Sequence, residues 1–481
     1  MTQNSPDQAA NIIKLKISSN FGDGAIDISG GVVDFQYYES VLSNHVTCTI
    51  VIMETGFEMD KSGKPKASKG LIDSLPIRGG ERVDIIMEDN YGNELKIDEG
   101  LYVNRLRDVD AGTSQDIFFM DLASREYFAN EQTRVTKRYE GSISQNVEKI
   151  LKDVLLVESK PDVDETAEPY NFIGNDKKPF YICTWLASKS IPQMESEKGE
   201  NATGGAAGYL FFQTREGFHF KSIDKIFAGE PVKKYIFNNS PELPPGFDAK
   251  ILLTDIESDI DLNEKLTLGT YHNRSIFFDF YALNYTVRDY KLGEDDPLAG
   301  LNLTQKERQI VYQSVSSSLS NGSMATSSKI TPAGKKIDDL VAKEFTQSPS
   351  RLMTHILDVG TQPTGSTAED QLEHWKKNRE APNFKAMETM QASIMRYNQM
   401  FTIKTNIIIP GDFSIKAGDV VFCDFPELSG SDKKDTNPES GGLYMVAHVC
   451  HKVTSGSTTT SLALVRDSYG KKPTGTNQIL A

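Results

Sequence analysis

Residues 100–103 read Gly-Leu-Tyr-Val, and residues 442–445 read Gly-Leu-Tyr-Met. Upstream of each copy, a glycine and polar residues lead to a valine that enters an apolar run. The two upstream runs are Gly80-Glu81-Arg82-Val83 and Gly418-Asp419-Val420. A phrase that recurs together with its upstream context predicts a duplicated β unit, with one copy towards each end of the chain.

The spacing downstream of the two copies also matches. Leu122 follows Leu101 by the same distance along the chain as Leu464 follows Leu443, and a polar stretch closes each copy. Two unrelated hairpins are the alternative interpretation. A duplicated unit predicts a subunit that covers two equivalent positions in a ring, and no catalytic feature of the sequence competes with this assembly argument.

Length and composition bound the class of protein. The chain has 481 residues, more than one hydrophobic core usually holds, which predicts about three domains. Its formal net charge of −15 argues against tight binding to DNA, which requires clustered Lys and Arg. No signal pattern opens the chain and no run of about 18 apolar residues occurs, so we expect no membrane insertion. Four scattered cysteines predict buried thiols rather than a disulfide framework.

The strand and helix patterns predict a mainly β fold with an α+β middle. Residues 10–125 hold short β-branched and aromatic runs bounded by turns, which predict a small antiparallel barrel or sandwich. Residues 140–228 change to helical spacing, beginning with a capping box at 142–145. Strand patterns return at 232–290 and at 401–468. These two stretches predict a second, similar barrel that is split by a helical insertion.

The predicted domains follow from these patterns. They are a first β-barrel domain at 1–125, an α+β middle domain at 126–230, a second, split β-barrel domain at 231–299 and 400–470, a Ser-rich linker and helical insertion at 300–399, and a C-terminal tail at 471–481. Within the second barrel, we expect further strands at Lys265–Leu268, Ser275–Phe280 and Ala282–Val287.

One predicted strand is strongly acidic. Alternate residues of a strand lie on opposite faces, so one face would hold Asp255, Glu257, Asp259 and Asp261. A calcium loop is a poor alternative, because Ile260 stands where the loop requires glycine. The acidic face is either a solvated outer surface or the lining of a channel, where it would repel DNA phosphates and keep passing DNA from adhering.

No motif predicts a catalytic residue, a cofactor site or a metal site. His448 and Cys450 share a strand face while His451 points away, and no second pair has zinc-like spacing. The Gly-rich run at 204–208 precedes a strand, so it lacks the helix N-terminus that a phosphate loop needs. Adjacent carboxylates, such as those at 295–296, are expected by chance in an acidic chain. We therefore predict that the protein is not an enzyme and carries no cofactor.

The C-terminal residues resemble a known family. The runs 416–422, 442–449 and 461–468 resemble the end of baseplate hub proteins of contractile-tailed phages, above all those of T-even-like phages and their cyanophage members. The hub of Mu-like phages and the type VI secretion spike share the same plan. Residues 179–193 and 208–212 are similar to the middle domain of that family.

The resemblance implies an architecture and a set of partners. It implies a homotrimer whose two barrels per subunit form a pseudo-sixfold ring, which adapts the hexameric tail tube to the trimeric central spike and lets DNA through its lumen. The implied partners are the spike, a tail tube or tube-initiator protein, and wedge or other baseplate proteins. The implied location is the tail baseplate of a virion assembled in the host cytoplasm. Compared with the type member of the family that it resembles, this chain is longer, mainly through residues 300–395.

Two other functions compete with this interpretation. A cell-wall or polysaccharide hydrolase would need two carboxylates fixed in a cleft, and no segment resembles a lysozyme. A type VI-like injection spike normally carries a C-terminal β-helix, whereas this sequence stops at Ala481, just after the second predicted barrel.

Overall fold

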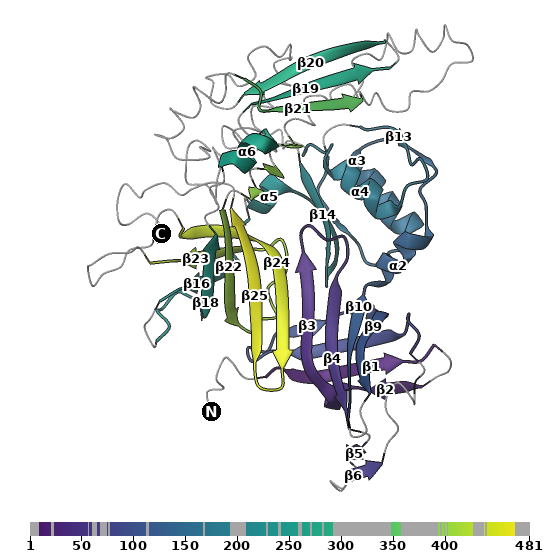
Figure 1. Ribbon diagram of the computed structural model, residues 1–481, viewed down its shortest axis with the longest axis vertical. Coiled ribbons are helices and arrows are strands. Elements are labelled where there is room, and N and C mark those ends of the chain that lie inside the picture. Colours follow the sequence, from purple (N-terminus) through teal and green to yellow (C-terminus); the bar gives the residue numbers. More distant parts are fainter. Residues whose placement is uncertain are drawn as a thin grey trace.

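Two β units share one continuous sheet of 15 strands in the computed structural model, and a helical domain lies beside them (Figure 1). The prediction of a mainly β fold with an α+β middle is confirmed. The structure describes residues 9–20, 24–55, 57–59, 65–67, 75, 77–111, 115–166, 169–192, 208–227, 229–238, 242–257, 262–269, 272–280, 283–291, 348–356, 393–394, 397–398, 400–401, 403–426, 437 and 440–466.

The first unit is an antiparallel sheet from the N-terminal part of the chain. Its strands are β1 (Asn11–Ser18), β2 (Ala25–Asp27), β3 (Val32–Ser40), β4 (Thr47–Glu54), β7 (Arg82–Glu88), β8 (Glu94–Lys96), β9 (Leu101–Ala111) and β10 (Asp116–Ala123). Their order is β3-β4-β10-β9-β7-β1-β2, with β8 beside β7. Buried residues alternate with half-buried ones, as in β4, where Cys48, Ile50 and Ile52 are buried. One face therefore packs into an apolar core and the other meets solvent.

The second unit is assembled from two distant stretches of chain. Its strands are β16 (Lys233–Ile236), β17 (Ala249–Lys250), β18 (Leu253–Glu257), β22 (Ile403–Pro410), β23 (Val420–Asp424), β24 (Gly442–Thr454) and β25 (Thr458–Arg466). They lie in the order β18-β22-β25-β24-β23-β16-β17 around a core of their own. The alternation of buried and half-buried residues again leaves one face of β22, β24 and β25 towards solvent.

A single long strand joins the two units. Residues 442–445 of β24 pair with β23, whereas residues 448–454 pair with residues 34–40 of β3 in the first unit. The other edge of β24 pairs with β25 from Met445 to Val453. Figure 1 shows β24 and β3 side by side at the centre of the molecule. The two units are therefore parts of one sheet rather than separate lobes.

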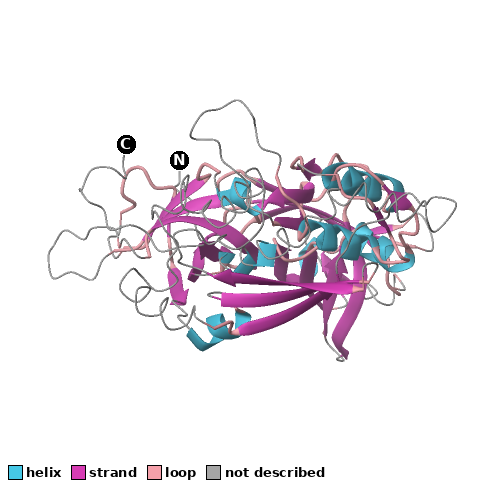
Figure 2. Ribbon diagram, turned by 90° about the horizontal axis from the view of Figure 1, so that it is seen from above, coloured by secondary structure: helices cyan, strands magenta, loops and turns pink. Residues whose placement is uncertain are grey.

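The middle domain packs helices against short strands. It comprises α2 (Arg125–Gln132), β11 (Arg138–Tyr139), α3 (Ile143–Lys149), a π turn at Ile150–Val154, β12 (Asp162–Val163), β13 (Phe172–Ile173), α4 (Pro179–Ala187), β14 (Tyr209–Thr214), β15 (Gly217–Ser222) and α5 (Ile223–Phe227). Ser142 caps α3 by accepting the Gln145 N–H, as the capping box predicts. Every residue of β14 is buried, because Tyr209 and Phe211 enter the core of this domain while Leu210 and Phe212 enter that of the second unit. Figure 2 shows the helices gathered mainly at one end.

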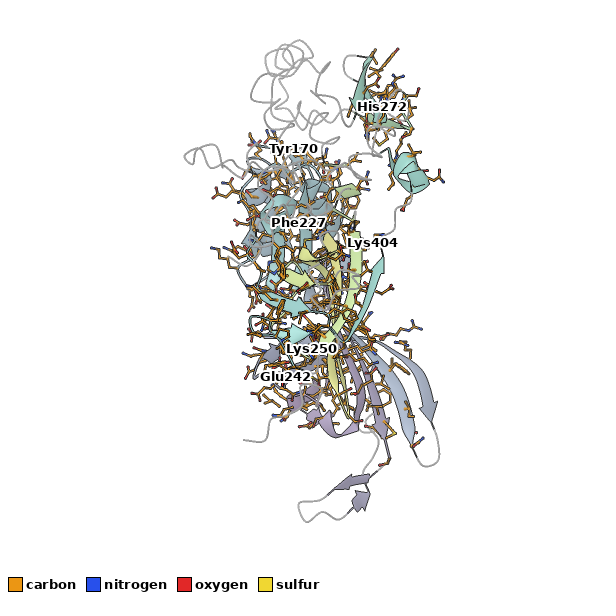
Figure 3. The ribbon with its side chains drawn as sticks, turned by 90° about the vertical axis from the view of Figure 1, so that its left-hand side faces the viewer. Tyr170, Phe227, Glu242, Lys250, His272 and Lys404 are labelled. Carbon is orange, nitrogen blue, oxygen red and sulfur yellow. The ribbon has the colours of Figure 1, made fainter. Side chains whose placement is uncertain are left out.

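A third, three-stranded sheet stands apart from both units. It consists of β19 (His272–Asp279), β20 (Asn284–Lys291) and β21 (Arg351–Ile356), with β19 in the centre. Figure 3 places His272, at the start of β19, near the top of the view and far above Glu242 and Lys250. β19 and β20 cover the stretch in which the sequence predicts further strands of the second barrel, and they form strands in this separate sheet instead.

The predicted strand at Lys265–Leu268 lies in helix α6 (Leu262–Leu268). The alternation of apolar and polar residues there fits a strand, but Leu262 and Leu266 also stand at helical spacing. Gly269 ends the helix with a φ of +73°. A short hairpin of β5 (Phe57–Met59) and β6 (Pro65–Ala67) completes the described elements.

Several predicted segments lie outside the described residues. They are residues 1–8, most of the predicted insertion at 300–399, the tail at 471–481 and the Gly-rich run up to residue 207. In the part of the chain that the structure does describe, no helix combines the length and the apolar character needed to span a membrane.

Candidate functional site

A four-residue turn occurs once in each unit. Arg78-Gly79-Gly80-Glu81 precedes β7, and Lys416-Ala417-Gly418-Asp419 precedes β23. The third residue of both turns is a glycine with positive φ, +83° for Gly80 and +89° for Gly418, a conformation that other residues adopt only with strain. The acidic fourth residue accepts the backbone N–H of the basic first residue, at 2.9 Å in the first turn and 3.0 Å in the second.

The same pair of backbone bonds fastens both turns to the neighbouring long strand. The Gly80 N–H donates to the Val103 carbonyl at 2.7 Å, and the Val103 N–H donates to the backbone carbonyl of Glu81, the acidic residue of the turn, at 2.9 Å. In the second turn, the Gly418 N–H donates to the Val446 carbonyl and the Val446 N–H donates to the Asp419 carbonyl, both at 2.8 Å. Val103 on β9 therefore corresponds to Val446 on β24.

This correspondence shifts the repeated phrase by one residue. If Val103 matches Val446, then Leu101 matches Tyr444 rather than Leu443. Leu101 and Tyr444 are both fully buried, whereas Tyr102 is only half-buried. A slip of one residue turns every side chain of a strand to the opposite face, so the matching letters of the two phrases occupy different environments. The turn, and not the phrase, sets the register of the duplication.

The bulges and the strand order extend the match. The pairing of β9 with β10 shifts by one residue beyond Val103–Leu122, and the pairing of β24 with β25 shifts beyond Val446–Leu464. Bulges at the same position of two ladders bend the strands alike. The order β3-β4-β10-β9-β7 in the first unit corresponds position by position to β18-β22-β25-β24-β23 in the second. Leu122 and Leu464, which the sequence pairs by spacing, are therefore equivalent.

The solvent-facing side of the eight strands from β18 to β9 is continuous and carries mostly polar side chains, with apolar ones such as Met53, Phe119 and Leu253 among them. Its uncharged polar side chains include Gln36, Tyr38, Thr47, Thr49, Asn406, His448, Thr459 and Ser461. Charges of both signs occur among them: Arg107 pairs with Asp121 at 2.9 Å, and Lys452 with Asp34 at 3.7 Å. We call this surface the polar face.

The acidic pattern of the sequence meets the polar face only in part. β18 ends at Glu257, so it holds two of the four predicted acidic residues. Asp255 is exposed on the polar face opposite Asn406, and Glu257 stands opposite Lys404 in the ladder. Asp259 and Asp261 lie outside the described residues.

A buried carboxylate joins three parts of the molecule. Glu39 on β3 is 1% exposed and accepts the Tyr37 hydroxyl at 3.0 Å within its own strand. It also accepts the Arg215 N–H of the β14–β15 hairpin at 2.8 Å and the Ala417 N–H of the second turn at 3.0 Å. Burial raises the pKa of Glu39, against the opposing effect of the Arg215 charge and these donors. The sequence analysis did not identify Glu39. A signal was present, because Glu39 stands two positions after Tyr37 and therefore on the buried face of an alternating strand.

One arrangement in the middle domain has the distances of a hydrolytic triad. Thr214 Oγ1 lies 2.9 Å from His219 Nε2, and His219 Nδ1 lies 3.4 Å from an Asp162 oxygen. However, Thr214 is buried, its hydroxyl accepts the Glu216 N–H at 3.2 Å, and it does not line the adjoining cavity of about 270 Å³. The contacts hold the hairpin together and do not present a nucleophile to a substrate.

The His448, Cys450 and His451 cluster is divided between the two faces of β24. On the polar face, the His448 ring stacks on the Tyr38 ring, with 5.9 Å between the ring centroids. His451 is buried, and its Nε2 donates to the Ile415 carbonyl at 3.2 Å. Burial, with the Arg215 charge adding to it, lowers the pKa of His451 to about 3. Within the described ranges, no group of three or more His, Cys, Asp or Glu residues is placed to hold a metal ion.

The sequence matches no protein-family model and no curated protein. Solved structures that resemble the chain include a tail protein from Neisseria meningitidis MC58, with 10% identity and a TM-score of 0.46, over 94% of this chain and 96% of that one. The 43 kDa tail protein of prophage MuSo2 from Shewanella oneidensis has 10% identity and a TM-score of 0.45, over 95% and 98% of the two chains. An Escherichia coli component of the type VI secretion system has 9% identity and a TM-score of 0.35, over 96% and 79%.

Proposed function

We propose that this protein is a structural subunit of a phage tail baseplate hub, in which three copies form a pseudo-sixfold ring around a channel for DNA. One observation carries the proposal. A single chain holds two units with the same turn, the same bulge and the same strand order, and these units are already joined edge to edge by β24 and β3. A contact that joins one unit to the next in the same sense, if repeated, generates a ring when its rotation closes and an open filament when it does not.

The composition of the polar face supports the proposal that this face lines the channel. Each unit buries one face of its sheet in an apolar core and leaves the other polar. Eight strands per chain contribute to the polar face, and channel diameter grows with the number of strands in a closed sheet. The described charges of this face include the ion pairs Arg107–Asp121 and Lys452–Asp34, in which a carboxylate offsets a cation that could hold a phosphate. Asp255 and Glu257, and from the sequence Asp259 and Asp261, would add negative charge to this lining.

The number of copies and the partners follow from the family resemblance of the C-terminal runs. Three copies with two units each present six similar positions to a hexameric tail tube and three to a trimeric central spike. The proposed location is the tail baseplate of a virion, and wedge or other baseplate proteins would complete the contacts. The protein acts by assembly in this proposal, without catalysis.

The mass of the assembled protein tests the proposal. Size-exclusion chromatography with light scattering on the full chain should give three times the 53.4 kDa of one chain, alone or after addition of the spike and tube proteins from the same source. Negative-stain images should show rings with threefold or sixfold symmetry. A protein that stays monomeric with both partners present would contradict the proposal.

A peptidoglycan zymogram tests the absence of catalysis. We expect no clearing by the purified chain, because Thr214 is buried and its hydroxyl is engaged by the hairpin. Clearing that persists in the Thr214→Val and His219→Gln variants would reveal a different hydrolytic centre, and clearing that disappears in them would assign the activity to this arrangement.

A further inference from the structure

We infer that the ring closes by antiparallel pairing of β9 in one copy with β18 in the next, in a register that places Arg107 opposite Glu257. The inference rests on the proposed ring and specifies the contact between neighbouring copies. It follows from the contact that the chain already makes with itself and from the charges at the two remaining edges.

The template is the pairing of β24 with β3. Cys450 stands opposite Tyr38, Val453 opposite Phe35 and Thr454 opposite Asp34, in antiparallel register. β24 belongs to the second unit and β3 to the first. In the corresponding places, the first unit has β9 and the second has β18.

Both of these corresponding edges lack a strand partner in the described part of the chain. β9 pairs with β10 on one side and with β7 only at residues 101–102 on the other, so the edge from residue 105 to residue 111 has no ladder. β18 pairs with β22 alone. Leu253 on β18 is 63% exposed and Ile256 is 38% exposed. Uncovered strand edges of this kind are templates for pairing with another chain.

The duplication transfers the register from one contact to the other. Because Val446 matches Val103 and a bulge follows each, Cys450 matches Arg107. On the other strand of the contact, Tyr38 matches Glu257. The reason is that their strand partners, Thr47 for Tyr38 and Lys404 for Glu257, occupy equivalent positions in the two units.

The transferred register fixes one pair between copies: Arg107 of one copy would stand opposite Glu257 of the next. The transfer ends there, because β9 has a second bulge between Arg107 and Asp110, whereas β24 has none at the matching place.

The charges on the two edges are complementary. β9 carries Arg105 and Arg107 in its unpaired part, and β18 carries Asp255 and Glu257. In the transferred register Arg105 is the diagonal neighbour of Glu257, within reach of a long side chain. The contact within the chain has the uncharged residues Cys450 and Tyr38 at the equivalent place, and its own ion pair, between Lys452 and Asp34, lies farther along the two strands. A covalently tethered contact needs no charge to select its partner, whereas a contact between acidic copies gains both attraction and register from opposite charges.

The alternative is that Asp255 and Glu257 only protect an exposed strand edge from unwanted pairing, which is a common role of charged residues on edge strands. Reversal of the charges separates the two roles. In the full chain, Arg107→Glu and Glu257→Arg should each raise the protein concentration at half-assembly by about tenfold or more. The double variant should recover most of the loss.

Arg138→Glu is the matched control, because Arg138 is also half-exposed and ion-paired but lies in the middle domain. It should leave assembly unchanged. Thermal unfolding of each variant monitors the fold, since Arg107 also pairs with Asp121 within its own chain.

Cysteine cross-linking tests the register directly. The native cysteines are buried or half-buried, so an Arg107→Cys, Glu257→Cys variant, held at a protein concentration high enough for assembly, should oxidise to covalent dimers and trimers within assembled rings. Arg107→Cys with Asp255→Cys, two residues out of register, should react much less.

Rings that form normally in both single charge variants, or that give no cross-link in the predicted register, would overturn this contact while the ring itself stands. Cross-links confined to single chains would also overturn it. Absence of rings in the unmodified protein with its partners would instead overturn the proposed function.

Discussion

The two duplicated turns share a backbone but use their carboxylates differently. Glu81 accepts two N–H groups of its own turn, those of Arg78 and Gly79, both at 2.9 Å. Asp419, one methylene shorter, accepts only that of Lys416. The equivalent of the Gly79 N–H is that of Ala417, which donates to Glu39 of the first unit at 3.0 Å.

This difference shows how a duplicated unit was adapted to hold its partner unit. The first turn is self-contained, because its acid satisfies both exposed donors. The second turn leaves one donor for β3, and so ties the second unit to the first at the place where β24 and β3 pair.

The largest effect should come from removal of the shared acceptor. Glu39→Ala leaves the Tyr37 hydroxyl and the Arg215 and Ala417 N–H groups without their buried partner, and we expect a loss of about 3–5 kcal/mol in the free energy of unfolding. Glu81→Ala frees two donors of a partly exposed turn and should cost about 1–3 kcal/mol. Urea denaturation measures both. A smaller loss for Glu39→Ala than for Glu81→Ala would contradict the role of Glu39 as the joint.

Alanine at the two equivalent glycines should give unequal losses. Each substitution forces an L residue into positive φ, at about 1–2 kcal/mol. A Cβ at Gly418 would also lie 2.9 Å from the Phe212 ring, whereas at Gly80 the nearest atom is 3.7 Å away on Asn20. We therefore expect Gly418→Ala to cost about 1–3 kcal/mol more than Gly80→Ala. Equal midpoints in urea would show that the middle domain does not press on the second turn.

The second turn should also respond to pH. Burial raises the pKa of Asp419 to about 6, so the folded chain binds this proton more tightly than the unfolded chain. Its contribution to stability is complete below the unfolded pKa and is lost as the pH rises through 6. Over that interval the Asp419 contribution should decline by up to about 1.4 kcal/mol per pH unit.

Asp419→Asn should flatten this part of the stability curve. The asparagine oxygen can still accept the Lys416 N–H, so the turn itself remains intact. Denaturation series at pH 4 to 8 would measure the difference between the two proteins. An unchanged slope in the variant would contradict the assignment to Asp419.

The smallest effect should come from the polar face that both units share. Lys452 and Asp34 form an ion pair across β24 and β3 at 3.7 Å, with both side chains partly exposed. Lys452→Ala should cost less than about 1 kcal/mol, and the cost should shrink in high salt. A larger loss that persists in salt would mean that this pair, and not only Glu39, fastens the two units.

The sequence correctly indicated that a unit is duplicated, but it did not give the correct residue-by-residue alignment of the two copies. Gly-Leu-Tyr at 100 and at 442 marks two equivalent strands, but the letters align one residue away from the structural register. The shift has a physical cause: strands alternate with a period of two, and Leu101 and Tyr444 both point into a core. The better signal was the turn, because a glycine at positive φ and a capping acid have a fixed place in the hydrogen-bond pattern.

Local chemistry in the sequence determined the strands and their alternation, the two glycine turns, the capping box of α3 and the absence of a predicted catalytic motif. Only the tertiary structure decided which edges meet. Glu39 finds its partners 176 and 378 residues away, and β24 divides its edge between β23 and β3. Alternation tells which face of a strand is buried, but every strand edge offers the same N–H and C=O groups. The choice of neighbour therefore depends on long-range packing, which no local pattern contains.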